Sequence, residues 1–182
     1  MADVIIVGDG PGGLSAALFL AKNGKSVTVI GGDKTPMHEA MLYNYLGIDE
    51  MTGSDFQAKG REQARRLGAD LIDGEATEVS RGEGGFTVVA GGQTHTAKYL
   101  VLACGPNPAI AEGVGLALND RKMLDTDRDG RTEVDGCYAI GWSTRPDKIQ
   151  AIISAGDGAA AALDILSLEA GKAFHDFDVV EK

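Results

Sequence analysis

The residues with the clearest chemical potential are three glycines near the N-terminus, spaced as Gly-x-Gly-x-x-Gly. They are Gly8, Gly10 and Gly13, within a run that also contains Pro11 and Gly12. In this fingerprint the first glycine allows a tight turn and the second lets a pyrophosphate approach the backbone. The third lets a helix pack closely on a strand. The spacing therefore indicates a loop that binds the phosphates of a dinucleotide.

The flanking segments provide the elements that such a loop needs. Residues 4–7 form a β-branched run, typical of a strand buried on both faces of a parallel sheet. Residues 14–21 have helical apolar spacing, and residues 26–30 predict a second strand. Free N–H groups at the start of the helix favour phosphate, and proline is well tolerated at this position. The order strand, glycine turn, helix, strand is the context that the fingerprint requires.

The end of the second predicted strand departs from the usual pattern. Dinucleotide folds place an acid there to hold the adenine ribose, and this chain has Gly31, Gly32 and Asp33. Asp33 either reaches the ribose or belongs to a solvated turn, and we favour the turn. The nature of the dinucleotide therefore stays open from these residues alone.

Composition excludes several classes of protein. The chain has 182 residues, 43% of them hydrophobic, and a formal net charge of −10. That length predicts one domain over residues 1–182. The acidity argues against nucleic-acid and anionic-membrane surfaces, which need clustered positive charge. We expect a cytoplasmic protein, because no export signal begins the chain and no uninterrupted apolar run approaches membrane-spanning length.

Two further patterns have both a functional and a structural interpretation. The spacing of Asp125, Asp127 and Asp129 resembles the start of a calcium loop, but the acid required at its twelfth position is missing, so we expect a hairpin turn and no metal site. Cys104 ends a predicted strand at the nucleotide-facing edge of the sheet, and a redox role is one interpretation of that place. With no CxxC and no basic neighbour in sequence, a free cysteine is the commoner outcome for both Cys104 and Cys137.

Residues 8–14, with the two alanines at 16 and 17, resemble the FAD-binding opening of the low-molecular-weight thioredoxin reductases. These belong to the pyridine nucleotide-disulfide oxidoreductases, and they also tend to have a glycine at the position of Gly31. Residues 43–47 resemble a family segment whose asparagine, here Asn44, lies close to the flavin. Residues 100–105 resemble the strand that closes the first half of the FAD domain.

The resemblance extends to the C-terminal part of the chain. Residues 130–141 match the last strand of the family, and residues 150–156 match its closing helix, whose N-terminus points at the pyrimidine end of the flavin. One departure stands out, because the family has an aspartate for the ribityl chain where this chain has Trp142. The cofactor-binding residues that the fingerprint and the resemblance imply are Gly8, Gly10, Pro11, Gly12, Gly13, Gly31, Gly32, Asp33, Asn44, Ala76, Cys104, Gly105, Gly141, Trp142, Gln150 and Ala151.

The fold implied is a single FAD-type Rossmann domain of the α/β class. We expect a parallel sheet in the order 3-2-1-4-5 with helices on one side, and a small antiparallel β-meander of residues 77–80, 86–90 and 94–97 on the other. A helix over residues 54–67 is expected, with a capping box of Ser54 and Gln57 and an apolar stripe of Phe56, Ala64 and Leu67. Another helix should begin near Pro146, capped by Ser143 or Thr144.

The resemblance also implies what this chain lacks. The family inserts an NADPH-binding domain with an active CxxC, whereas here residues 104–108 pass directly towards the second half of the FAD domain. We therefore expect a minimal FAD flavoprotein, an oxidoreductase that needs a separate electron donor or partner, with no identifiable catalytic residue. The alternatives are a flavin- or nucleotide-binding module without turnover, and a domain that holds NAD(P) or ADP. The face left bare by the missing domain predicts a homodimer or a protein redox partner.

Overall fold

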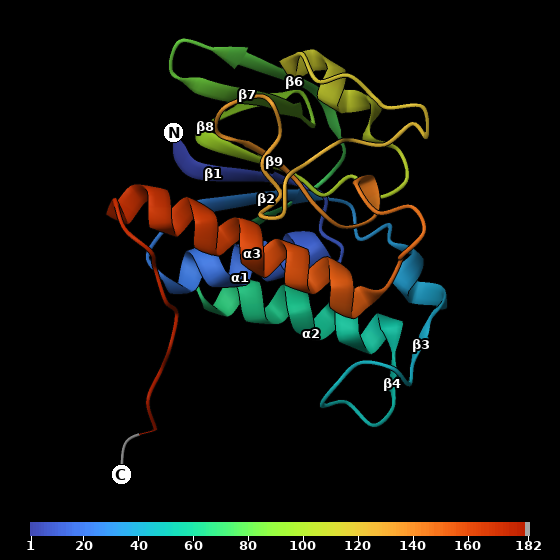
Figure 1. Ribbon diagram of the computed structural model, residues 1–182. Coiled ribbons are helices and arrows are strands. Elements are labelled where there is room, and N and C mark those ends of the chain that lie inside the picture. Colours follow the sequence, from blue (N-terminus) through green and yellow to red (C-terminus); the bar gives the residue numbers. More distant parts are fainter. Residues whose placement is uncertain (181–182) are drawn as a thin grey trace.

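The protein is built around one mixed β-sheet with three long helices on one of its faces (Figure 1). The computed structural model describes residues 1–180. The sheet contains β1 (Ala2–Val7), β2 (Val27–Gly31), β5 (Asp70–Asp73), β6 (Ala76–Gly82), β7 (Gly85–Ala90), β8 (Gln93–Leu102) and β9 (Cys137–Ala139). A separate pair is formed by β3 (Met41–Leu42) and β4 (Met51–Thr52), and the helices are α1 (Pro11–Lys22), α2 (Gly53–Arg66) and α3 (Ala151–Ala170). Short 3₁₀ turns are η1 (Pro36–Glu39), η2 (Pro108–Val114) and η3 (Gly141–Ser143).

The parallel part of the sheet has the order β5-β2-β1-β8-β9, which confirms the predicted order. The expectation that residues 94–97 and residues 100–105 belong to different strands was wrong. Residues 94–97 and 100–102 belong to the single strand β8, and Ala97 pairs with both Phe86 of β7 and Ala2 of β1. The segment between them contains no residue that breaks a strand, so the antiparallel meander continues directly into the parallel sheet.

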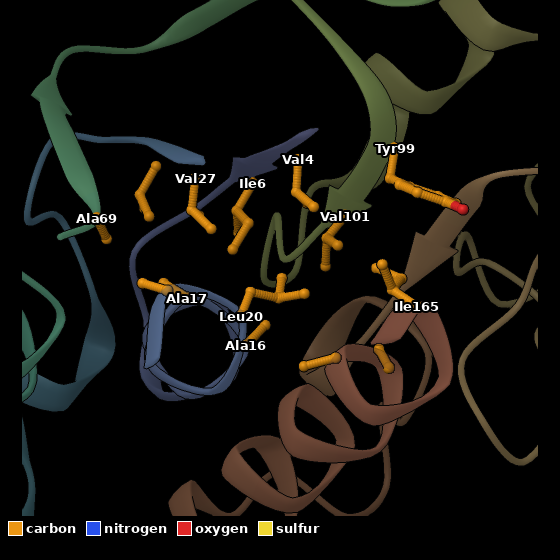
Figure 2. Close-up of a cluster of buried hydrophobic side chains, with 14 of the residues drawn as sticks. Val4, Ile6, Ala16, Ala17, Leu20, Val27, Ala69, Tyr99, Val101 and Ile165 are labelled. Carbon is orange, nitrogen blue, oxygen red and sulfur yellow. The ribbon is translucent and has the colours of Figure 1, made fainter. Parts of the chain in front are cut away.

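Both faces of β1 are buried, as its apolar run predicts. Val4 and Ile6 face the helices, where they pack with residues such as Leu20 and Ile165 (Figure 2). Ile5 and Val7 belong to a second cluster beneath the meander and η2. A slip by one residue would move each side chain of β1 into the cluster on the opposite face, where close packing fits a different side chain, so packing fixes the register. The loop that follows β1 is therefore held in a defined place.

Helices α1 and α3 pack against each other through glycine. A Cβ added at Gly158 of α3 would lie 2.1 Å from the carbonyl oxygen of Gly12, so the two backbones touch. The side chains of Ala16, Ala161 and Ala162 are also fully buried in this region. This contact brings the start of α3 alongside the glycine loop, although the two are about 140 residues apart in the sequence.

Helix α2 corrects two expectations. Its N-cap is Thr52, whose side chain accepts a hydrogen bond from the backbone N–H of Asp55 at 3.1 Å, so the capping box of Ser54 and Gln57 was wrong. The face of the helix that is buried carries Gln57 and Arg61 beside Ala64, whereas Phe56 is only half-buried. Two polar side chains therefore occupy a face that we predicted to be apolar.

The last helix starts later than predicted. It begins at Ala151 with Gln150 as N-cap, and Ser143 and Thr144 belong to or follow the turn η3. By length and composition α3 could span a membrane, but a core helix meets the same test. Here the buried face of α3 packs on α1 and the sheet. Two aspartates of the helix also form ion pairs, Asp157 with Arg145 and Asp164 with Arg131.

The end of α3 is tied to the sheet through Glu169. Its carboxylate accepts hydrogen bonds from Lys98 at 2.5 Å, Lys25 at 3.0 Å and the hydroxyl of Tyr99 at 2.8 Å. The hydrogen bonds from Lys98 and Lys25 lower the pKa of Glu169 to about 2. A carboxylate whose pKa is lowered by folding stabilises the folded state above its unfolded pKa and loses that effect as the pH falls towards its folded pKa.

We therefore expect Glu169→Gln to reduce the free energy of unfolding by about 1 kcal/mol at pH 7, a value discounted because the cluster is partly exposed. The difference from the unmodified protein should shrink between pH 5 and pH 2. Urea unfolding followed by circular dichroism at a series of pH values measures it. Glu112→Gln, on the exposed surface of η2, is the matched control. A difference that stays constant down to pH 2.5 would contradict this account.

Candidate nucleotide-binding cleft

A cleft of about 770 Å³ opens at the carboxyl ends of the parallel strands. It lies where β1 is flanked by β2 on one side and β8 on the other, the crossover point at which open α/β sheets bind ligands. Every residue predicted to bind a cofactor lines this cleft except Asp33. Those that do so are Gly8, Gly10, Pro11, Gly12, Gly13, Gly31, Gly32, Asn44, Ala76, Cys104, Gly105, Gly141, Trp142, Gln150 and Ala151.

The glycines of the loop differ in what surrounds them. Gly8 has a φ of +106°, and a Cβ there would lie 2.2 Å from the carbonyl oxygen of Ala103. A Cβ at Gly13 would lie 1.9 Å from the carbonyl oxygen of Gly8, so helix α1 rests directly on the turn. Gly10, by contrast, has an ordinary backbone conformation and no atom nearer than 3.7 Å to such a Cβ. Its lack of a side chain leaves free space in the cleft.

Two helices begin at this cleft. Helix α1 starts at Pro11, and α3 starts at Ala151, directly after Gln150. Neither helix has an acidic residue in its first turn. The first N–H groups of a helix lack intrahelical acceptors and carry a partial positive charge. The side-chain amide of Asn44 donates a hydrogen bond to Gln150 Oε1 at 3.0 Å, which ties the loop between β3 and β4 to the start of α3. The two helix ends favour negative charge at two places in one cleft.

Asp33 lies in a turn outside the cleft lining, as we favoured. Its φ is +54°, and both its carbonyl oxygen and its carboxylate lie within hydrogen-bond distance of His38 Nε2. The other ring nitrogen of His38 lies 2.9 Å from the hydroxyl of Ser54. The prediction of Asp33 as a cofactor-binding residue therefore has no support from its position.

A buried charge network that was not predicted from the sequence lies beneath the glycine loop. Asp9 is 5% exposed, and its Oδ2 forms an ion pair with Arg61 Nη1, whose Nη2 reaches the exposed Asp73. The side chain of Gln57, fully buried, donates a hydrogen bond to the carbonyl oxygen of Asp9 at 2.6 Å. The signal was present in α2, where Gln57 and Arg61 stand four residues apart on the side that also carries Ala64.

Asp9 also explains the glycine at the end of β2. A Cβ at Gly31 would lie 2.3 Å from the carboxylate carbon of Asp9. Any larger residue at position 31 would therefore displace the buried carboxylate. The missing ribose acid and the acid inside the glycine loop are thus consequences of one packing arrangement.

The two cysteines are free and far from disulfide geometry. In the parallel pairing of β8 with β9, Cys137 lies opposite Leu100. Cys104 is four residues further along the chain from Leu100, which places it well beyond disulfide distance from Cys137. Burial raises the pKa of each thiol to about 12, so both are protonated near neutral pH. Although Cys104 lines the cleft, a protonated thiol is a poor nucleophile.

The titratable side chains that line the cleft, among residues 1–180, are those of Asp9, Lys34, Glu75 and Cys104. In the same described part of the chain no group of three His, Cys, Asp or Glu residues is placed to hold a metal ion. Asp127 instead accepts hydrogen bonds from the backbone N–H groups of Asp129 and Arg131, which forms the predicted turn.

The buried pair between Asp9 and Arg61 should matter far more to stability than the exposed pair between Arg61 and Asp73. Arg61→Met leaves Asp9 buried without a cation and should lower the free energy of unfolding by about 3 kcal/mol or more. Asp73→Asn removes only an exposed partner and should cost about 1 kcal/mol or less. Urea unfolding of the two variants beside the unmodified protein measures both values. Equal decreases in the free energy of unfolding would show that the buried pair stabilises the fold no more than the exposed pair.

Comparison with known proteins agrees with this architecture. The family model for pyridine nucleotide-disulphide oxidoreductases matches residues 2–112. A thioredoxin reductase from Listeria monocytogenes is 34% identical over 108 residues, 57% of this chain and 33% of that protein. A bifunctional thioredoxin reductase/thioredoxin from Mycobacterium leprae is 30% identical over 162 residues, 86% of this chain and 33% of that protein. The chain thus spans about a third of the length of these curated relatives.

Solved structures extend the similarity to the whole fold. A thioredoxin reductase from Gloeobacter violaceus matches with a TM-score of 0.86 at 17% identity, and the match spans 99% of each chain. Identity that low carries the fold alone, whereas the family model covers more than half of the 182 residues. The chain therefore belongs to the pyridine nucleotide-disulphide oxidoreductase family, as a thioredoxin-reductase-like domain.

Proposed function

We propose that residues 1–182 form a single-domain flavoprotein that binds FAD and takes part in electron transfer with a separate donor or partner. The observation that carries the proposal is that two helices begin at one cleft. The open space at Gly10 lies beside the start of α1, and the start of α3 lines another part of the same cleft. One ligand with an anionic pyrophosphate and an electron-poor ring matches both ends. FAD is the family cofactor with that chemistry, and a volume of about 770 Å³ is within the range of ligand pockets.

The residues present divide the cleft into three parts. The N–H groups at Gly12 and Gly13 would hold the pyrophosphate, as at other helix N-termini. The ends of β2 and β5, with Gly32, Gly74 and Ala76, would surround the adenosine. Asn44, Trp142 and Gln150 would enclose the isoalloxazine, and the start of α3 favours negative charge beside it. A bound flavin supplies the electron-transfer chemistry, while these residues bind, orient and shield it.

The chain does not support disulfide reduction of the thioredoxin reductase kind. Its two cysteines are 33 positions apart and protonated, and no CxxC is present in the sequence. Between β8 and β9 the chain passes through η2 and a loop, with no second Gly-x-Gly-x-x-Gly in the sequence. The donor and the acceptor therefore have to be sought outside the thiol chemistry of the family.

A single methyl group at Gly10 tests the proposal. Gly10→Ala should leave folding unchanged, because its Cβ meets nothing closer than 3.7 Å. The methyl would occupy the place of the pyrophosphate, so the affinity for FAD should fall at least tenfold, about 1.4 kcal/mol. Quenching of flavin fluorescence in a titration of the apoprotein measures the affinity, and thermal unfolding checks the fold.

The matched control is Gly82→Ala, at the outer end of β6, where a Cβ meets no atom within 4 Å. It should bind FAD as the unmodified protein does. An unchanged affinity in the Gly10 variant would remove the glycine loop from the binding site and overturn the proposed position of FAD.

The alternative is a flavin- or nucleotide-binding module without turnover. Trp142 favours it, since it lines the cleft where the resemblance implies a carboxylate for the ribityl chain. Anaerobic mixing of the FAD-loaded protein with NADH and NADPH distinguishes the two. We expect bleaching of the flavin faster than that of free FAD in the same buffer, because Asn44, Trp142 and the start of α3 would hold the ring in a fixed orientation for the donor. Bleaching no faster than that of free FAD would favour the module.

Exposed apolar side chains surround that end of the cleft. Tyr43 and Leu46, 68% and 88% exposed, follow β3, and Ile149 and Ile152 are exposed at the start of α3. The hydrogen bond between Asn44 and Gln150 holds these two segments together. Exposed apolar side chains on two segments that are held together are typical of an interaction site. It supports the proposal of a homodimer or a protein redox partner at this face.

Light scattering at micromolar concentration tests the homodimer. The unmodified protein should have the mass of two chains, and Leu46→Lys should return it to one chain. Leu168→Lys is the control, because Leu168 is 51% exposed near the other end of α3. A monomeric unmodified protein would count against the homodimer and leave the separate partner.

A further inference from the structure

The carboxylate of Asp9 lies at the place where the fold family puts its ribose-binding acid. That acid normally extends from the last residue of β2, which is Gly31 here. A Cβ at Gly31 would lie 2.3 Å from Cγ and 2.5 Å from Oδ1 of Asp9. The carboxylate therefore occupies the start of the path that an acid at position 31 would follow. Asp9 also lines the cleft, unlike Asp33.

The two oxygens of Asp9 have different surroundings. Oδ2 accepts the backbone N–H of Asp33 at 3.1 Å and forms the ion pair with Arg61. Oδ1 has no hydrogen-bond partner in the described chain, yet it is not among the buried side-chain atoms left without one, which are Gln57 Oε1 and His95 Nε2. A side-chain oxygen that is unpartnered but not sealed off, on a residue that lines the cleft, is available to a ligand.

The rest of the network fixes that oxygen in place. Arg61 and the N–H of Asp33 hold one side of the carboxylate, and Gln57 holds the carbonyl group of the same residue at 2.6 Å. A buried aspartate held at so many points loses little freedom when a ligand binds. A carboxylate that accepts a hydroxyl hydrogen makes a charge-assisted bond, about twice as strong as a neutral one.

We propose that Oδ1 of Asp9 accepts a hydrogen bond from a hydroxyl of the adenosine ribose, and that Arg61 is the residue that positions it. Asp9 thereby replaces the acid missing from the end of β2. The proposal rests on the proposed binding of FAD and adds the residue that recognises its adenosine half. A carboxylate in that place also disfavours a 2′-phosphate, so it selects dinucleotides whose ribose hydroxyls are free.

Binding of nucleotides that differ by one hydroxyl tests the proposal without any mutation. The apoprotein is titrated calorimetrically with ADP, 2′-deoxy-ADP and 3′-deoxy-ADP. We expect ADP to bind about tenfold more tightly than at least one of the deoxy nucleotides. Equal affinity for all three would overturn the proposal.

The variant Asp9→Asn ties the effect to the residue. Arg61 needs an acceptor, so asparagine should turn its oxygen to Arg61 and its NH₂ group to the cleft. The preference for ADP should then fall to about threefold or less, whereas Asp73→Asn, which alters the exposed partner of Arg61, should keep it in full. A full preference in the Asp9 variant would assign the discrimination to another group.

Failure of this inference can be told apart from failure of the proposed function. If the protein binds FAD and ADP but ignores the ribose hydroxyls, only the role of Asp9 falls. If it binds neither FAD nor ADP, the proposed function falls and this inference falls with it.

Discussion

Direct contact between backbones at the glycines is the constraint on which the rest of this structure depends. Gly13 lies on the carbonyl group of Gly8, and Gly158 lies on that of Gly12, so a methyl group at either position would overlap the partner atom. These contacts set the distance between β1, α1 and α3. Because of them, two helices that are remote in sequence begin at the same cleft.

The sequence predicted the parts of the fold that depend on local pattern. The β-branched run of β1, the glycine turn and the apolar spacing of α1 each have a single reasonable interpretation, and the family resemblance supplied the strand order. The meander was less well predicted, since nothing in residues 93–102 shows that one strand pairs with β7 at its start and with β9 at its end. Pairing partners are a property of the whole fold and leave no trace within a single strand.

The partner of Arg61 and Gln57 in the charge network was beyond prediction for a related reason. Asp9 stands at a variable position of the fingerprint, and Arg61 is a normal residue for the outer face of a helix. Only the folded chain shows that they meet over Gly31, with Gln57 beside them. The predicted binding residues, in contrast, came from elements whose ends meet by topology. All of them but Asp33 line the cleft, and their role in binding stays a prediction.

Binding of FAD is the central claim, and the visible absorption spectrum of the freshly purified protein tests it most directly. Heat release followed by chromatography identifies the ligand. The account predicts a yellow protein that releases FAD, close to one molecule per chain. A colourless protein that also fails to take up added FAD would contradict it.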